Sequence, residues 1–224
     1  ESSNGIMPQN NIIRWKDGRG WIVLSGGEDT GSAVRASAIG RSTAGGVTAY
    51  LTFGSHSADA EKILDDMEDL GASSGYLVDV LTEDDETIRE RLSEAMLIVL
   101  QTATDPDDVR SGLIGAAMDG IEAAYANGAV ILAEGTTAAL FGTWFLLSDN
   151  QVGGGLDWLE HILVVPGINA IADSPMAHSF LRSQPDAVAI VVGKGAALAL
   201  GPDGEIEKWG NGQVTVALGS GYHP

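Results

Sequence analysis

The segment AEGTTAALFG, residues 133–142, contains the side chains best placed to do chemistry. An apolar run over 129–133 stops at Glu134 and Gly135, and a second apolar run follows two threonines. This pattern predicts a strand, a sharp turn and a helix, the arrangement that raises a nucleophile above the edge of an α/β sheet. Thr137 would be that nucleophile, because a neighbouring base could activate its hydroxyl for attack on a carbonyl.

Three other polar segments follow predicted strands. The sequence SGGED at 25–29 offers glycine amides and two carboxylates, a histidine follows the second strand, and QTAT at 101–104 follows the fourth. Because ligands of open parallel sheets bind beyond the carboxyl ends of the strands, we expect these segments to line one cleft. The candidate ligand-binding residues are Gly27, Glu28, Asp29, His56, Gln101, Thr102, Glu134, Thr136 and Ala138.

Alternating apolar and amphipathic segments predict the elements that position these residues. Apolar runs predict five strands, and between them helical spacing of apolar side chains predicts three helices. The strands are Trp21–Ser25, Val47–Phe53, Tyr76–Leu81, Met96–Leu100 and Ala129–Ala133, and the helices are Ala58–Leu70, Glu83–Ala95 and 106–126. The alternation indicates an α/β protein with a mostly parallel central sheet covered by helices on both faces.

The C-terminal part has a different pattern of short, closely spaced strands. They are expected at Ile162–Val165, Ala187–Val192, Ala196–Leu200, Glu205–Trp209 and Gln213–Ala217, and they predict a small antiparallel extension of the sheet. No linker divides the chain, so we expect one α/β domain over 1–224 with an N-terminal extension over 1–19.

Composition excludes several function classes. The 224 residues include 31 acidic and 12 basic ones, a formal charge of -19 that repels nucleic acid and anionic membranes. The acidic run over 59–69 fits a solvated helix face. The chain has no cysteine, and its four histidines lack the spacing of a metal site, so we expect neither metal nor cofactor. Without a long apolar segment, a soluble, cytoplasmic rather than secreted protein is expected.

Three motifs together resemble one enzyme family. The turn GGED at 26–29, the segment YANGAVILAEGTTAA at 125–139 and GGLDWL at 154–159 look like the serine peptidases of the cyanophycinase and aspartyl dipeptidase (peptidase E) type. The resemblance covers most of 20–218. It implies a flavodoxin-like, three-layer α/β sandwich related to class I glutamine amidotransferases, and cleavage of β-aspartyl or N-terminal aspartyl peptide bonds without a metal.

The catalytic motifs of that family are altered here. The family elbow reads Gly-Thr-Ser-Ala-Gly-Ala, whereas 135–140 reads GTTAAL, which puts Thr137 in the place of serine. The histidine that acts as the general base in the family is missing from the strand end at 164–169, and neither His161 nor His178 replaces it. The glycine turn of the oxyanion hole is replaced by LQTAT at 100–104. The combined losses argue against acyl transfer.

Three functions stay open at this point. The first is a degenerate peptidase relative that binds a small peptide or amino-acid-like ligand in the cleft. In it, Glu134 either faces the cleft with Glu28 and Asp29 and favours a cationic group, or forms an ion pair with Arg35 or Arg110.

The second function is an enzyme with Thr137 as nucleophile, His56 or His178 as base, and Glu134 or Asp29 as the group that orients the base. The third is an interaction or assembly protein that uses the apolar run 144–147 with Trp158, although core packing is the more ordinary use of such a run. The partners expected are the small ligand and a second copy of the chain in a homodimer.

Overall fold

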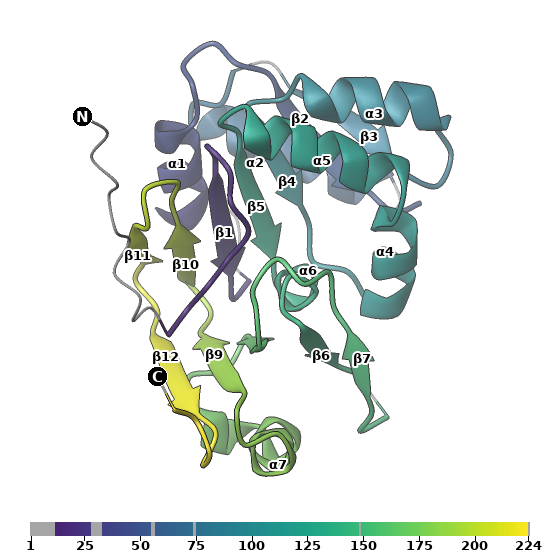
Figure 1. Cartoon of the computed structure of the whole chain (residues 1–224). Helices are drawn as coiled ribbons and strands as arrows, with labels where there is room; N and C mark the ends of the chain where they lie inside the picture. The colour runs from purple at the N-terminus through teal and green to yellow at the C-terminus, as the bar shows by residue number, and fades with distance from the viewer. Residues whose placement is uncertain (1–11, 28–32, 55–56, 74, 148, 224) are drawn as a thin grey trace, which may run out of the picture.

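A central seven-stranded sheet organises the molecule (Figure 1). The computed structural model describes residues 12–27, 33–54, 57–73, 75–147 and 149–223. The sheet has the order β11-β10-β1-β5-β4-β2-β3. Its five parallel strands are β1 (Trp21–Ser25), β2 (Thr48–Thr52), β3 (Gly75–Asp79), β4 (Leu97–Leu100) and β5 (Val130–Glu134). These pairings confirm the predicted, mostly parallel sheet. Its strands have apolar residues on both faces, so both sides of the sheet must be covered.

Helices cover both faces of this sheet. Helices α1 (Ala33–Arg41) and α2 (Ser57–Asp69) pack on one face, behind the sheet in Figure 1, through Val34, Ala38 and Met67. Helices α3 (Asp85–Ser93) and α5 (Ala116–Ala126) pack on the other face. The helix predicted over 106–126 is two helices, since α4 (Pro106–Leu113) ends before Gly115, whose φ of 106° breaks the helical path.

The predicted antiparallel extension is confirmed for two of the C-terminal strands, and the other predicted strands form part of a second sheet. Strands β10 (Ala196–Leu200) and β11 (Ile206–Gly210) do extend the main sheet as an antiparallel hairpin beside β1. A second sheet of order β12-β9-β8-β6-β7 holds the others: β6 (Trp144–Leu146), β7 (Val152–Gly154), β8 (Ile162–Pro166), β9 (Val188–Val192) and β12 (Val214–Leu218). Strands β8 and β9 are parallel, because the segment between them contains η1 (Ile171–Asp173) and α7 (Pro175–Ser183) and is long enough for a crossover.

The apolar run 144–147 packs against the core, although Trp144, Leu146 and Leu147 are only half-buried. Phe145 and Trp158 are buried, and Trp158 contacts the rings of Phe141 and Tyr125. No helix among the described residues is long and apolar enough to cross a membrane.

Candidate functional site

The turns that follow three strands meet at the carboxyl edge of the main sheet. Strands β1 and β5 run in register with Ser25 opposite Glu134, and the amide of Gly135 donates to the Ser25 carbonyl at 3.0 Å. A Cβ on Gly27 would lie 3.7 Å from the Cα of Gly135, and one on Gly167 would lie 3.7 Å from the Gly26 oxygen. The ends of β1, β5 and β8 therefore converge, and we call this convergence the elbow region.

Gly135 makes the sharp turn between β5 and the short helix α6 (Thr136–Ala139). Its φ of 57° and ψ of −128° are a combination that residues with a side chain rarely adopt. A Cβ added here would lie 2.4 Å from the Oγ1 of Thr102 and 2.8 Å from its Cβ. The residue at the strained turn therefore has no side chain, and the space beside it is filled by Thr102.

Thr137 lies in α6, two residues beyond this turn. It has no exposed surface, and its Oγ1 donates a hydrogen bond of 2.5 Å to the carbonyl of Gln101. The hydroxyl that the sequence analysis predicted to stand above the sheet edge is therefore buried and paired with the loop after β4. The neighbouring Ala138 is also buried, and its amide donates to the Gly135 carbonyl at 3.0 Å.

Thr136 and Thr102 join α6 to the same loop. The Oγ1 of Thr136 accepts from the amide of Ala103 at 2.9 Å and donates to its carbonyl at 2.6 Å. The amide of Thr136 donates to the Oγ1 of Thr102 at 3.3 Å. Two backbone N–H groups beside the elbow are thus already bonded to threonine hydroxyls.

Glu134, the last residue of β5, forms a buried ion pair. Its two carboxylate oxygens accept from Nε and Nη2 of Arg35 at 2.8 and 3.1 Å, and only 4% of its surface is exposed. Nη1 of Arg35 donates to Asp66 at 2.6 Å. Burial alone would lower the pKa of Arg35, but the hydrogen bonds and charges of Glu134 and Asp66 outweigh it and raise the pKa. Of the two alternatives for Glu134, the structure shows the ion pair with Arg35.

Two buried side-chain nitrogens, on segments that contact α6, have no hydrogen-bond partner among the described residues. They are Nε2 of Gln101, in the loop after β4, and Nε of Arg110, on the helix α4 that contacts α6. Buried donors normally have partners, so unpaired ones mark positions where a ligand acceptor could bind. Gly27 belongs to the same edge, with φ at 90° and its amide bonded to the Ser25 hydroxyl at 3.2 Å.

The structure places His161 and His178 outside the elbow region. His161 precedes β8, at the end of that strand remote from the elbow, and His178 is exposed on α7. After β8 the chain has Asn169, whose Oδ1 lies against Gly193, where a Cβ would approach it to 2.4 Å. Glu28, Asp29 and His56 lie outside the described residues. Within the residues that are described, no group of three or more potential ligands could hold a metal ion.

Asp66 is the residue of this region that sequence reasoning missed. It was assigned with the rest of 59–69 to a solvated face, yet it is 8% exposed. The available signal was its position three residues after Ile63 and next to Met67, on the apolar side of the helix.

Solved peptidase structures share this fold. A peptidase from an acI-B1 Actinobacterium superposes with a TM-score of 0.75 at 20% identity, over 91% of this chain and 93% of that one. A putative peptidase E protein from Listeria monocytogenes EGD-e superposes with a TM-score of 0.58 at 12% identity, over 89% and 98%. No protein-family model and no curated protein matches the sequence. The chain therefore has a peptidase-like, flavodoxin-like α/β fold.

Proposed function

We propose that this chain is a peptidase-fold protein that lacks serine-peptidase activity and binds a small peptide or amino-acid-like ligand in the elbow region. The observation that carries the proposal is Gly135 at the strained turn between β5 and α6. A nucleophile elbow presents its reactive side chain from that turn, and glycine has no side chain to present.

The backbone conformation supports a different alignment with the family motif from the one that sequence similarity suggests. Placing the family motif Gly-Thr-Ser-Ala-Gly-Ala over AEGTTA at 133–138 puts its serine at Gly135 and its final alanine at Ala138. In this alignment Thr137 replaces the second glycine of the motif. Its burial and its bond to Gln101 then have an ordinary explanation as helix packing.

The hydrogen bonds of the elbow region also disfavour acyl transfer. An oxyanion hole needs N–H groups that are free to stabilise developing negative charge. The amide that follows the elbow residue, that of Thr136, donates to Thr102, and the amide of Ala103 donates to Thr136. In the second candidate, an enzyme with Thr137 as nucleophile, the amide that follows the nucleophile is that of Ala138, which already donates to the Gly135 carbonyl at 3.0 Å.

A ligand with carbonyl or carboxylate oxygens fits the unpaired donors. Nε2 of Gln101 and Nε of Arg110 have hydrogens to donate, whereas the carboxylate of Glu134 is already paired with Arg35. Peptides and amino acids carry such oxygens, so they are the ligand class we propose. Two further parts of the proposal, a cytoplasmic location and a homodimer, rest on the sequence alone.

The first test is hydrolysis of β-aspartyl and N-terminal aspartyl dipeptides by the native chain and by its Thr137→Ser and Thr137→Ala variants. We expect no release of amino acids by any of the three, measured by chromatography, with circular dichroism confirming that each is folded. Hydrolysis by the native chain that Thr137→Ala abolishes would overturn the proposal in favour of the enzyme.

The second test measures binding of the same dipeptides by thermal shift, since a ligand that binds the native state raises the unfolding temperature. We expect a rise for the native chain and a smaller rise for Gln101→Ala. Gln151→Ala is the matched control, because Gln151 is exposed in the turn between β6 and β7. Equal shifts in the two variants would remove Gln101 from the site, and no shift for any dipeptide would contradict peptide binding.

A further inference from the structure

Strand β12 is an outer strand of the second sheet and lies at the side of the molecule (Figure 1). Among the described strands it pairs with β9, and next to their ladder the amide of Gly193 donates to the carbonyl of Gln213 at 2.8 Å. Because hydrogen-bonded pairs alternate along an antiparallel ladder, the odd-numbered residues of β12 bond to β9. The N–H and C=O groups of Val214, Val216 and Leu218 therefore point to the open side of the strand.

This open edge combines unpaired backbone groups with exposed apolar side chains. Within the described part of the chain, the N–H and C=O groups of Val214, Val216 and Leu218 have no hydrogen-bond partner. Val216 and Leu218 are 42% and 48% exposed, although they lie on the same face of the sheet as the buried Ile190 and Val188 of β9. An edge of this kind is a template for a further strand.

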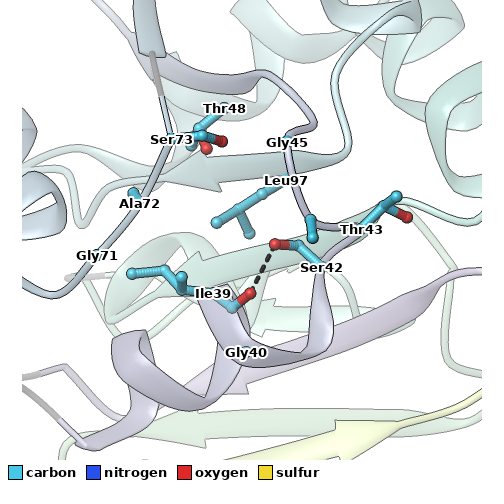
Figure 2. A pocket seen from close by; sticks show the side chains of 11 residues that line it. Ile39, Gly40, Ser42, Thr43, Gly45, Thr48, Gly71, Ala72, Ser73 and Leu97 are labelled. Atoms are coloured by element: carbon cyan, nitrogen blue, oxygen red, sulfur yellow. Dashed lines mark hydrogen bonds between the residues drawn. The ribbon is translucent and has the colours of Figure 1, made fainter.

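The outer strand β3 of the main sheet is protected by side-chain contacts. Nη1 of Arg91 on α3 donates to the Leu77 carbonyl at 3.3 Å, and the phenol of Tyr76 donates to the Arg91 carbonyl. The segment that leads into β3 borders the small pocket shown in Figure 2, where the hydroxyl of Ser73 donates to the Gly46 carbonyl at 2.5 Å. The β3 edge is therefore already engaged by other parts of the chain.

The outer strands β11 and β7 are protected by charge and by length. Strand β11 contains Lys208 and Glu207, which pairs with Arg41 at 3.1 Å, and charged side chains hinder the pairing of edge strands. Strand β7 has only three residues, and two of them are glycine. Strand β12 has none of these protections, because it is five residues long and the segment 213–222 contains no charged residue and no proline.

The open edge of β12 is complementary to a second copy of itself. When two β12 strands lie antiparallel about a two-fold axis at Val216, Val216 pairs with the partner subunit's Val216, and Val214 pairs with the partner subunit's Leu218. Each copy then supplies three N–H donors and three carbonyl acceptors, and each of them meets a counterpart. The side chains of these residues share one face, so the exposed apolar surfaces of the two copies lie side by side.

The charge of the chain favours the same contact. With a formal charge of -19, two copies repel each other over most of their surfaces. The uncharged segment 213–222 is a place where two backbones can approach without bringing like charges together.

We propose that β12 pairs with the β12 of a second copy, which joins the second sheets of two chains into one continuous sheet across a two-fold axis. The homodimer of the proposed function rests on the sequence, and this inference gives it an interface. Ligand binding in the elbow region does not depend on the interface, so either can fail without the other.

The first test measures the mass of the native chain and of two variants by sedimentation velocity over a range of protein concentrations. Val216→Lys puts a positive charge against its own copy at the two-fold axis, and we expect it to weaken self-association by at least about tenfold. Val152→Lys is the matched control, because Val152 is 43% exposed on β7, and it should dimerise like the native chain. Circular dichroism confirms that each variant is folded.

The outcomes of this test separate the interface from the homodimer. A Val216→Lys variant that dimerises as tightly as the native chain would overturn the β12 interface and keep the homodimer. A native chain that is still a monomer at about 100 μM would overturn both.

The second test mixes two variants and depends on the two-fold register. Val216→Lys and Val216→Glu should each be monomeric alone, since each places like charges opposite one another. Their mixture should form a heterodimer, because the lysine of one copy then faces the glutamate of the other. A mixture that stays monomeric, while the native chain dimerises, would overturn the pairing of Val216 with its own copy.

Discussion

At Gly135 a side chain is excluded by two separate causes. The combination of φ at 57° and ψ at −128° disfavours any residue with a Cβ, and the side chain of Thr102 occupies the space that the Cβ would need. The same threonine accepts the amide hydrogen of Thr136. Gly135 and Thr102 are therefore coupled: a substitution at one of them changes how much a substitution at the other lowers the free energy of unfolding.

Gly135→Ala should lower the free energy of unfolding by about 2–4 kcal/mol, from backbone strain and from the close approach to Thr102. Adding Thr102→Gly removes the contact but not the strain, so the double variant should lose less than the sum of the two single variants. Urea unfolding of the four chains measures this coupling. Strictly additive losses would show that Thr102 does not fill the elbow space.

At the scale of elements, Arg35 connects three of them. It lies on α1 and binds Glu134 at the end of β5 and Asp66 on α2. All three side chains are buried, so removal of Arg35 would take the positive charge away from two carboxylates that are held out of water. These ion pairs hold two helices against the strand that leads into the elbow.

Arg35→Met should lower the free energy of unfolding by about 3–5 kcal/mol, because Glu134 and Asp66 lose their buried partner. Arg89→Met is the matched control, since Arg89 pairs with Asp119 on the surface at 3.2 Å. An exposed pair of that kind contributes about 0–1 kcal/mol. Chemical denaturation compares the two variants, and similar losses in both would contradict the role assigned to the buried pairs.

The helices and strands could be predicted where the local sequence pattern determines them. Which strands pair with one another could not. The parallel strands followed from apolar runs between amphipathic helices. The placement of β10 and β11 in the main sheet, with β12 in the second, depends on contacts between distant segments. The turn before α6 is a second example. The sequence alone aligns Thr136 and Thr137 with the Thr-Ser of the family motif, whereas the backbone dihedral angles place the sharp turn at Gly135.

At the scale of the whole molecule, each face of the main sheet contains a buried tyrosine. Tyr125 packs in the core on the α5 side and Tyr50 in the core on the α2 side. Burial, reinforced by the charge of Glu68, raises the pKa of Tyr50 to about 12. Burial and the charge of Asp17 likewise raise the pKa of Tyr125 to about 12. Ionisation of either phenol therefore opposes the packing of one face.

Alkaline pH should therefore destabilise the folded protein, because it ionises a buried tyrosine on each face of the main sheet. In the unfolded chain a tyrosine has a pKa near 10, so the raised folded pKa contributes stability that is complete below about pH 10 and is lost as pH rises towards 12. Each tyrosine should reduce the free energy of unfolding by up to roughly 1.4 kcal/mol per pH unit in this window. Urea unfolding at several pH values measures the slope, and Tyr50→Phe combined with Tyr125→Phe should make it shallower, because Phe keeps the ring and removes the ionisable group. A slope as steep in the double variant as in the native chain would assign the alkaline transition to other groups.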